Sequence, residues 1–358
     1  LPYLSAAGEL KTKPTQHSVK KLMESGVNAD IIVCRTEKSI SDDLRSKIAL
    51  FCNVDKNSVI ESIDAKTIYE VPLLMQAEKL DKVVLNKLNI KNKKKSDLND
   101  WKNFVDKLNN PKTTINIGLI GKYVELQDSY KSILESFVHA GAVNEAKVNV
   151  VPIHSEEIND KTINNILSKL DGILVAPGFG ERGIEGKILS IKYARENNLP
   201  FLGICLGMQM AVIEFARNVL GLKDANSTEM SKSTKNPVIS LMNDQLNVEE
   251  KGGTMRLGSW KCKLKKNSLA YSIYKKDLVS ERHRHRYELN FKYNEKLNKL
   301  GMISSGTNPK TGLVEIVEIP SHSWFIGVQF HPEYQSTVKN PHPIFVSFVS
   351  ACIKKNNQ

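Results

Sequence analysis

The chain reads Pro-Phe-Leu-Gly-Ile-Cys-Leu-Gly-Met at residues 200–208. The apolar run before Cys205 predicts a buried strand, and the residues after it predict a helix, so the cysteine stands at a sharp turn. Gly203 and Gly207 flank it at the second position on either side, as in a nucleophile elbow, where larger side chains would collide. The amides and dipole of the helix would favour a thiolate. The stretch predicts a cysteine nucleophile, and the alternative is a buried core cysteine.

Strands and helices alternate around this turn. The apolar and amphipathic patterns predict strands at residues 115–120, 147–153, 172–176 and 201–204, and helices at 130–141, 163–170, 188–197 and 208–219. Such alternation is typical of an α/β fold with a mostly parallel sheet flanked by helices. Functional sites in these folds lie at the carboxyl ends of the strands.

A second stretch offers partners for the cysteine. Residues 325–333 read Phe-Ile-Gly-Val-Gln-Phe-His-Pro-Glu, an apolar strand that ends near His331. A thiolate nucleophile needs a base, and the base needs an orienting group. Because residues two apart in an extended chain face the same side, we expect Glu333 to reach the His331 ring. The sequence thus predicts a triad of Cys205, His331 and Glu333.

A lysine-rich stretch at residues 89–97 divides the chain, since it is polar and has no periodic apolar face. A short amphipathic helix containing Trp101 and Phe104 follows it. With 358 residues, the chain has room for about two domains. We expect one domain at residues 1–95, a linker at 96–112 and a second domain at 113–358.

Composition excludes several classes of function. The net charge of +12 suits either a polyanion partner or a lysine-rich solvated surface, and the second is favoured because residues 91–95 lack interleaved aromatics. No apolar run approaches the roughly 20 residues of a membrane span, and no secretory signal begins the chain. The five cysteines form no Cys-x-x-Cys pair, which argues against zinc or disulfides. We expect a cytoplasmic protein without nucleic-acid or membrane partners.

The stretch Gly-Ile-Cys-Leu-Gly-Met-Gln at 203–209, together with Phe-His-Pro-Glu at 330–333, resembles the class I glutamine amidotransferases. The resemblance implies that Cys205 attacks the side-chain amide of glutamine, that His331 moves the proton and that Glu333 orients His331. Ammonia leaves, and water hydrolyses the thioester. No cofactor is implied for this half-reaction.

Further segments are similar to the CTP synthase family, and together they cover nearly the whole chain. These segments are residues 8–18, 121–126, 128–132, 226–229, 252–258 and 281–288. The resemblance implies a ligase of pyrimidine biosynthesis that uses ATP and Mg²⁺ to activate UTP at O4. Channelled ammonia then gives CTP, and GTP activates the glutaminase. A homo-oligomer, expected to be a tetramer, is implied as well.

The same resemblance assigns ligands to single residues. It assigns glutamine binding to Gln209, Glu229 and Arg286. The guanidinium fork of Arg286 suits the α-carboxylate of glutamine, and the carboxylate of Glu229 suits its α-ammonium. Without the resemblance, the alternative that Arg282, Arg284 and Arg286 are basic side chains pointing into solvent from a strand is equally favoured. The nucleotide positions fall on Lys11, Lys13, Gln16, Lys47 and Phe51 for UTP or inhibitory CTP, on Asp64 for ATP, and on Phe179, Arg182, Thr254 and Arg256 for GTP.

One loop departs from the family pattern, which usually reads Pro-Gly-Gly-Phe-Gly. Here residues 176–180 read Ala-Pro-Gly-Phe-Gly. Pro177 has no N–H and cannot donate to an oxyanion. Gly178 remains as one predicted donor, and Leu206, directly after the cysteine, is the second.

The chain contains no Gly-x-x-x-x-Gly-Lys-Ser/Thr phosphate loop. Because the family carries its ATP loop and magnesium carboxylates upstream of these segments, we expect residues 1–95 to be the C-terminal piece of a P-loop-type α/β synthetase domain. Such a fragment would hold no metal and would perform only the glutaminase half. The alternatives are another class I glutamine amidotransferase, a cysteine peptidase-like α/β hydrolase, and a regulatory or polymerising subunit with a silent site.

Overall fold

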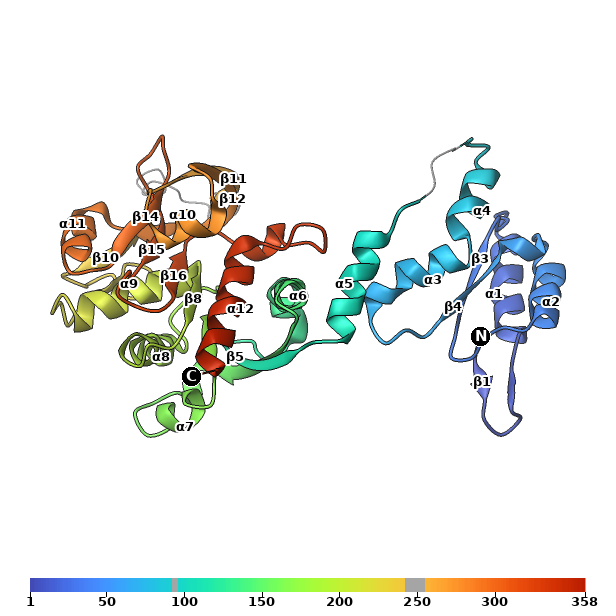
Figure 1. Ribbon diagram of the computed structural model, residues 1–358, viewed down its shortest axis with the longest axis horizontal. Coiled ribbons are helices and arrows are strands. Elements are labelled where there is room, and N and C mark those ends of the chain that lie inside the picture. The colour runs from blue at the N-terminus through green and yellow to red at the C-terminus, as the bar shows by residue number, and fades with distance from the viewer. Residues whose placement is uncertain (92–95, 242–254, 358) are drawn as a thin grey trace. The chain divides into compact units, whose positions relative to one another are not determined.

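The computed structural model describes residues 1–91, 96–241 and 255–357. They form two compact units that divide between Val105 and Asp106 (Figure 1). The division falls inside helix α5 (Asn99–Asn109), within the stretch that the sequence predicts to be a linker.

The first unit is a small α/β structure built around one parallel strand pair. Strands β3 (Ile32–Thr36) and β4 (Val59–Ile63) pair in parallel, with Ile32 opposite Val59. Apolar side chains of β3, β4 and α2 form its core together with Leu10 and Val19. The remaining elements of the unit are β1 (Tyr3–Leu4), β2 (Glu9–Leu10), α1 (Lys13–Glu24), α2 (Asp42–Cys52), η1 (Lys56–Ser58), η2 (Ile68–Glu70), α3 (Val71–Ala77) and α4 (Leu80–Lys87).

The second unit is organised by a nine-stranded sheet of strand order β12-β11-β14-β15-β16-β8-β7-β5-β6. From β16 to β6 all neighbouring strands are parallel, and from β12 to β16 they are antiparallel. The parallel strands are β5 (Thr113–Gly121), β6 (Ala146–His154), β7 (Gly172–Val175), β8 (Phe201–Ile204) and β16 (Phe325–Val328). The antiparallel strands are β11 (Arg256–Leu264), β12 (Leu278–His285), β14 (Ile303–Thr307) and β15 (Val314–Glu318).

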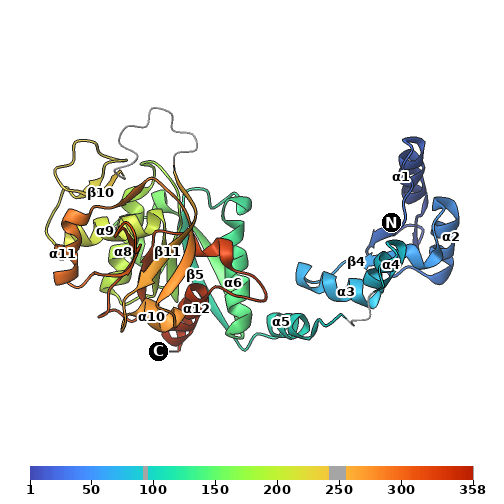
Figure 2. The same ribbon diagram turned by 90° about the horizontal axis from the view of Figure 1, so that it is seen from above.

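Helices cover both faces of this sheet (Figure 2). One face packs against α8 (Ile184–Glu196) and α9 (Leu206–Asn218), and the other against α6 (Lys131–Val143) and α12 (Pro343–Asn356). The other elements are η3 (Gln127–Tyr130), η4 (Ser155–Glu157), α7 (Ile163–Leu167), α10 (Leu269–Tyr274), α11 (Phe291–Lys299), η6 (Pro332–Gln335) and a small sheet of β9 (Asn226–Ser227), β10 (Pro237–Leu241) and β13 (Tyr287–Leu289).

The structure confirms the predicted α/β architecture. Strand β8 has the predicted bounds, whereas α8 begins four residues earlier than expected, at Ile184. The antiparallel extension was not predicted. Within the described residues, no helix is long and apolar enough to cross a membrane.

Candidate active site

Cys205 occupies the sharp turn between β8 and α9. Its backbone is left-handed in φ, at φ 52° and ψ −100°, a strained conformation for a residue with a side chain. A Cβ on Gly203 would lie 2.7 Å from the carbonyl carbon of Gly207, and one on Gly207 would lie 2.3 Å from the Val175 carbonyl oxygen. Both glycines are therefore required by the packing of the elbow.

The two strands that carry Cys205 and His331 are neighbours. Strand β16 pairs in parallel with β8, so that Val328 lies opposite Ile204, and both chains leave the sheet at the same edge. Nδ1 of the His331 ring donates to Glu333 Oε1 at 2.7 Å, and both side chains are buried. The sequence analysis expected Glu333 to reach the ring from an extended chain. That geometry was wrong, because Glu333 lies in the 3₁₀ turn η6 and reaches the ring from that turn.

Electrostatics favours a charged His331. Burial alone lowers the pKa of this imidazole, but the Cys205 sulfur and the Glu333 carboxylate together raise it to about 11. Nε2 of His331 is buried and makes no hydrogen bond to the described residues. A cationic imidazole near the sulfur stabilises the thiolate form of the cysteine.

Sequence reasoning missed Gln329, which touches the sulfur. Its Nε2 donates to Cys205 Sγ at 3.7 Å, and its Oε1 accepts from Gln209 Nε2 at 3.3 Å. Gln209 also donates to the Tyr287 carbonyl at 2.9 Å. The position of Gln329 directly after β16, level with Cys205, was the available signal.

The loop at residues 176–180 lies beside the start of α9. A Cβ on Gly178 would lie 3.5 Å from Leu206 Cδ2, so the two residues that are predicted to supply oxyanion donors are neighbours. Two buried lysines that the sequence analysis missed hold this loop. Lys187 Nζ donates to the Ala176 carbonyl at 3.1 Å, and Lys122 Nζ donates to the carbonyls of Phe179 and, at 3.2 Å, Gly180.

Glu229 and Arg286 lie near the same tyrosine ring. Burial and the Glu229 carboxylate raise the pKa of the Tyr287 hydroxyl, whereas Arg286 lowers it. Glu229 Oε1 accepts from the Gly180 amide at 2.9 Å. In the described parts of the chain neither charge has an ion-pair partner, so both are available to a zwitterionic ligand. Arg282 and Arg284 point to solvent from β12, as the alternative reading expects.

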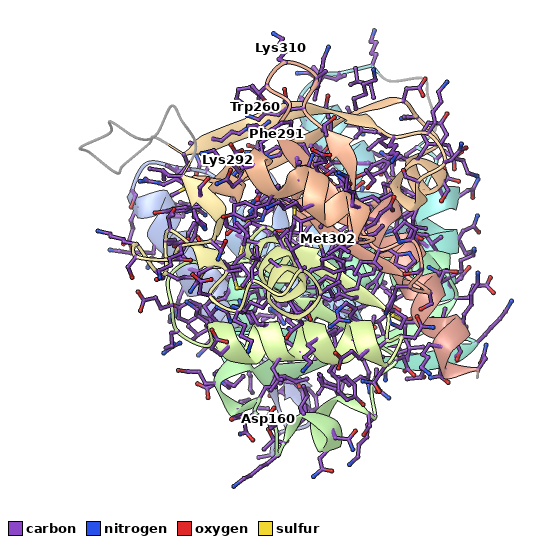
Figure 3. The ribbon with its side chains drawn as sticks, turned by 90° about the vertical axis from the view of Figure 1, so that its left-hand side faces the viewer. Asp160, Trp260, Phe291, Lys292, Met302 and Lys310 are labelled. Carbon is purple, nitrogen blue, oxygen red and sulfur yellow. The ribbon has the colours of Figure 1, made fainter. Side chains whose placement is uncertain are left out.

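The described residues assigned to GTP differ in exposure and in the groups that they contact. Phe179 is half exposed, and Arg182 donates to the Lys122 carbonyl at 3.3 Å. Arg256 is buried and pairs with Glu315 at 2.7 Å, and its guanidinium lies over the ring of Trp260, which Figure 3 labels. Thr254 lies outside the described residues.

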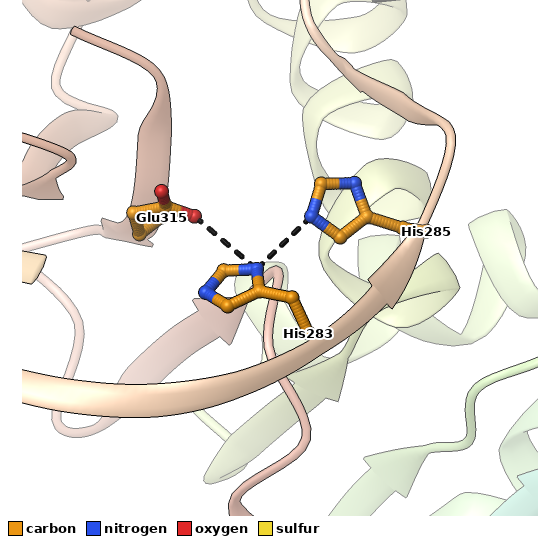
Figure 4. A group of neighbouring side chains, drawn as sticks. All are labelled: His283, His285 and Glu315. Carbon is orange, nitrogen blue, oxygen red and sulfur yellow. Dashed lines mark hydrogen bonds and ion pairs between the residues drawn. The ribbon is translucent and has the colours of Figure 1, made fainter. Parts of the chain in front are cut away.

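A buried cluster of His283, His285 and Glu315 has the composition of a candidate metal site (Figure 4). Its three donor atoms lie within 4.8 Å of one another. Because the Tyr287 carbonyl can only accept, Nδ1 of His285 donates to it at 3.1 Å, and Nε2 of His285 accepts from Nδ1 of His283 at 3.0 Å.

The charges around this cluster favour a hydrogen-bonded network over a metal site. Burial lowers the pKa of His283 to about 2 and that of His285 to about 3, so both rings are neutral. The Arg256 guanidinium already compensates the Glu315 carboxylate. A buried divalent cation would add uncompensated charge to the cluster.

The nucleotide positions of the first unit are only partly brought together. Lys11 pairs with Glu9, and both Lys11 and, more weakly, Lys47 lower the pKa of that carboxylate. Gln16 donates to Thr12 Oγ1 at 3.1 Å. Lys13 begins α1 and is exposed, Phe51 is 59% exposed on α2, and Asp64 pairs with Arg35 at 3.3 Å.

Comparisons with known proteins match both units of the chain to related proteins. Residues 1–90 match the family model described as CTP synthase N-terminus, and residues 125–351 match glutamine amidotransferase class-I. The chain is 64% identical over 358 residues to a CTP synthase of Flavobacterium johnsoniae and 66% identical over 351 residues to one of Christiangramia forsetii. It covers 67% and 64% of those proteins, about two thirds of their length, while they cover 100% and 98% of this chain.

A solved structure supports the fold of the second unit. The glutaminase domain of Trypanosoma brucei CTPS, with bound acivicin, superposes with a TM-score of 0.63 at 39% identity. The match covers 67% of this chain and 94% of that domain.

Lys187 gives a prediction about pH and stability. Burial, and to a smaller extent Lys122, lower the pKa of Lys187 from 10.5 to about 7. At a pH between these two pKa values, the Lys187 amine is protonated in the unfolded chain and neutral in the folded protein. Stability rises with pH wherever the unfolded state binds more protons. From pH 7 to pH 10, the free energy of unfolding of the parent should therefore rise relative to that of Lys187→Met. Urea unfolding at each pH measures this difference.

The control for this experiment is Lys192→Met, on the same helix. Lys192 is half-buried and its amine makes no hydrogen bond or ion pair to the described residues. It should keep the pH dependence of the parent. Parallel pH profiles for the parent and Lys187→Met would contradict the burial of a shifted ammonium.

Proposed function

Because this chain belongs to the CTP synthase family, we propose that its second unit hydrolyses glutamine through Cys205, His331 and Glu333. The observation that carries the proposal is the strained elbow at Cys205, next to the His331–Glu333 pair that follows the adjacent parallel strand. A cysteine nucleophile, a charged imidazole and an orienting carboxylate are the parts that covalent amide hydrolysis needs.

The first step forms the thioester. The Cys205 thiolate attacks the side-chain carbonyl carbon of glutamine, and the carbonyl oxygen becomes an oxyanion. The backbone amides of Gly178 and Leu206 donate to that oxygen. The Leu206 amide is free to do so because it lies in the first turn of α9, where an N–H has no partner within its own helix. His331 gives its proton to the leaving nitrogen, so ammonia departs and the thioester remains.

The second step regenerates the enzyme. Neutral His331 removes a proton from water, which attacks the thioester carbon and releases glutamate and the thiolate. Glu333 keeps Nδ1 hydrogen-bonded, so that Nε2 exchanges protons in both steps. Arg286 and Glu229 bind the α-carboxylate and α-ammonium of the substrate, and Gln209 holds Gln329 against the sulfur.

The proposal extends to the whole reaction of the family. Ammonia from this site is channelled to UTP that ATP has activated at O4, giving CTP, and GTP stimulates the glutaminase. Lys11, Lys13, Gln16, Lys47 and Phe51 contribute to the UTP or CTP site and Asp64 to the ATP site, whereas Phe179, Arg182, Thr254 and Arg256 are linked to GTP. We also propose a homotetramer in the cytoplasm, and the unpaired state of all five cysteines supports a reducing compartment.

The described residues include one group of three metal-binding side chains, and its ligands do not suit Mg²⁺. This group offers two imidazoles and a carboxylate, whereas Mg²⁺ prefers oxygen ligands. We derive no step through Mg²⁺.

Two observations favour this function over its rivals. The match of residues 1–90 to the CTP synthase N-terminus disfavours other class I amidotransferases. Glu229 and Arg286, which form no ion pair with the described residues, suit a free amino acid better than a peptide bond, and this disfavours a peptidase.

Cys205→Ala tests the proposal most simply. It removes the nucleophile and should abolish glutamine hydrolysis, measured as ammonia release at saturating glutamine. His331→Ala should reduce the rate of ammonia release by about 10²–10⁴-fold. Glu333→Gln should reduce the rate by less, because Glu333 only orients the His331 ring. Cys34→Ala, which removes another buried cysteine, should stay fully active. Ammonia release by Cys205→Ala at the parental rate would contradict the proposal.

Arg286→Ala tests the substrate clamp. Loss of a charge-assisted contact costs about 1.5–3 kcal/mol, so KM for glutamine should rise roughly 10- to 100-fold with a smaller change in kcat. Arg284→Ala is the matched control, since Arg284 lies two residues away and faces solvent. Equal KM values for the two variants would mean that Arg286 does not bind the carboxylate.

A further inference from the structure

Lys187 is a lysine with no access to solvent. It lies on α8 with a relative exposure of 0%, although lysine is almost never fully buried without a paired charge. Its Nζ donates to the Ala176 carbonyl at 3.1 Å, and no carboxylate of the described residues lies within ion-pair distance. Such a costly arrangement needs a compensating function.

The bonded carbonyl belongs to the loop that carries a predicted oxyanion donor. Ala176 follows β7 directly, and its peptide with Pro177 has no N–H, so the carbonyl is the only polar group of that peptide. Lys187 fixes this peptide, and the proline ring fixes φ of Pro177 near −65°. One torsion, ψ of Pro177, then sets where the Gly178 N–H points.

The lysine also lies beside Gly178, one of the two predicted oxyanion donors. A Cβ on Gly178 would be 4.0 Å from Lys187 Nζ and 3.5 Å from Leu206 Cδ2. Burial, which is the larger effect, and Lys122 lower the pKa of Lys187, whereas Cys205 raises it, so the cysteine acts on the amine across this loop. Lys187, Gly178 and the start of α9 thus form one cluster.

We propose that Lys187 is a positioning residue for glutamine hydrolysis, which holds the Ala176 carbonyl so that the Gly178 amide faces the oxyanion. This inference rests on the proposed function. It assigns a role to Pro177 as well, because the rigid ring transmits the position of the fixed carbonyl to the next peptide. The N–H donor of Lys187 is what the loop requires, whether the amine is charged or neutral.

Two reactions of Cys205 separate this role from an effect on the sulfur. Glutamine hydrolysis passes through an oxyanion, whereas alkylation by iodoacetamide needs the thiolate but forms no oxyanion at the alkylated carbon. A residue that positions the oxyanion loop should affect the first reaction only. A residue whose charge activates the thiolate should affect both in proportion.

Lys187→Met removes the donor, and Lys187→Gln retains an N–H donor without charge. For Lys187→Met we expect kcat for glutamine to fall about 10²–10³-fold, the loss typical of one oxyanion donor, with KM and the alkylation rate within about threefold of the parent. Lys187→Gln should keep kcat within about tenfold. Lys192→Met, on the same helix, is the control and should match the parent in both reactions.

Three results would overturn the inference. The first is a folded Lys187→Met variant with kcat within about threefold of the parent, and the second is an alkylation rate that falls in step with kcat. The third is a folded Lys187→Gln variant whose kcat for glutamine is about 100-fold below that of the parent. This variant decides the question if Lys187→Met fails to fold. A parent chain that releases no ammonia from glutamine would overturn the proposed function and this inference together, whereas the three results leave the proposed function intact.

Discussion

The second unit depends on one backbone conformation, the left-handed φ of 52° at Cys205. This conformation is sparsely populated for a residue with a side chain, and the surrounding packing must enforce it. The close approach of Gly203 to Gly207, and of Gly207 to the Val175 carbonyl, provides that enforcement. The strain places the sulfur at the carboxyl edge of the sheet, where the neighbouring parallel strand delivers His331.

Hydrogen bonds from buried side chains then fix three groups of the candidate site. Glu333 fixes the imidazole, Gln209 fixes the amide of Gln329, and Lys187 fixes the carbonyl of Ala176. All of these side chains are buried, so their hydrogen bonds do not compete with water. For the proposed reaction, such preorganisation would lower the cost of placing charge on the oxyanion.

The catalytic triad stays a prediction, which the His331–Glu333 contact supports. Local patterns predicted the parallel half of the sheet and the elbow, because each depends on residues that are close in sequence or on strands that end at one edge. They did not predict the antiparallel strands, the reach of Glu333 from a 3₁₀ turn, or Gln329. Lys122 and Lys187 were missed for a physical reason. A lysine pattern in a sequence indicates surface charge, and only the three-dimensional packing of Lys187 on α8 and Lys122 after β5 against the loop shows that these two are buried.

The central claim is that glutamine is cleaved through a covalent bond to Cys205, and trapping that bond tests it most directly. The chain would be mixed with glutamine, quenched in acid during turnover, digested and analysed by mass spectrometry. The account predicts a γ-glutamyl thioester on the peptide that contains Cys205, and its disappearance after treatment with hydroxylamine. Ammonia release during turnover with an unmodified Cys205 peptide, or with the adduct on another cysteine, would contradict the account.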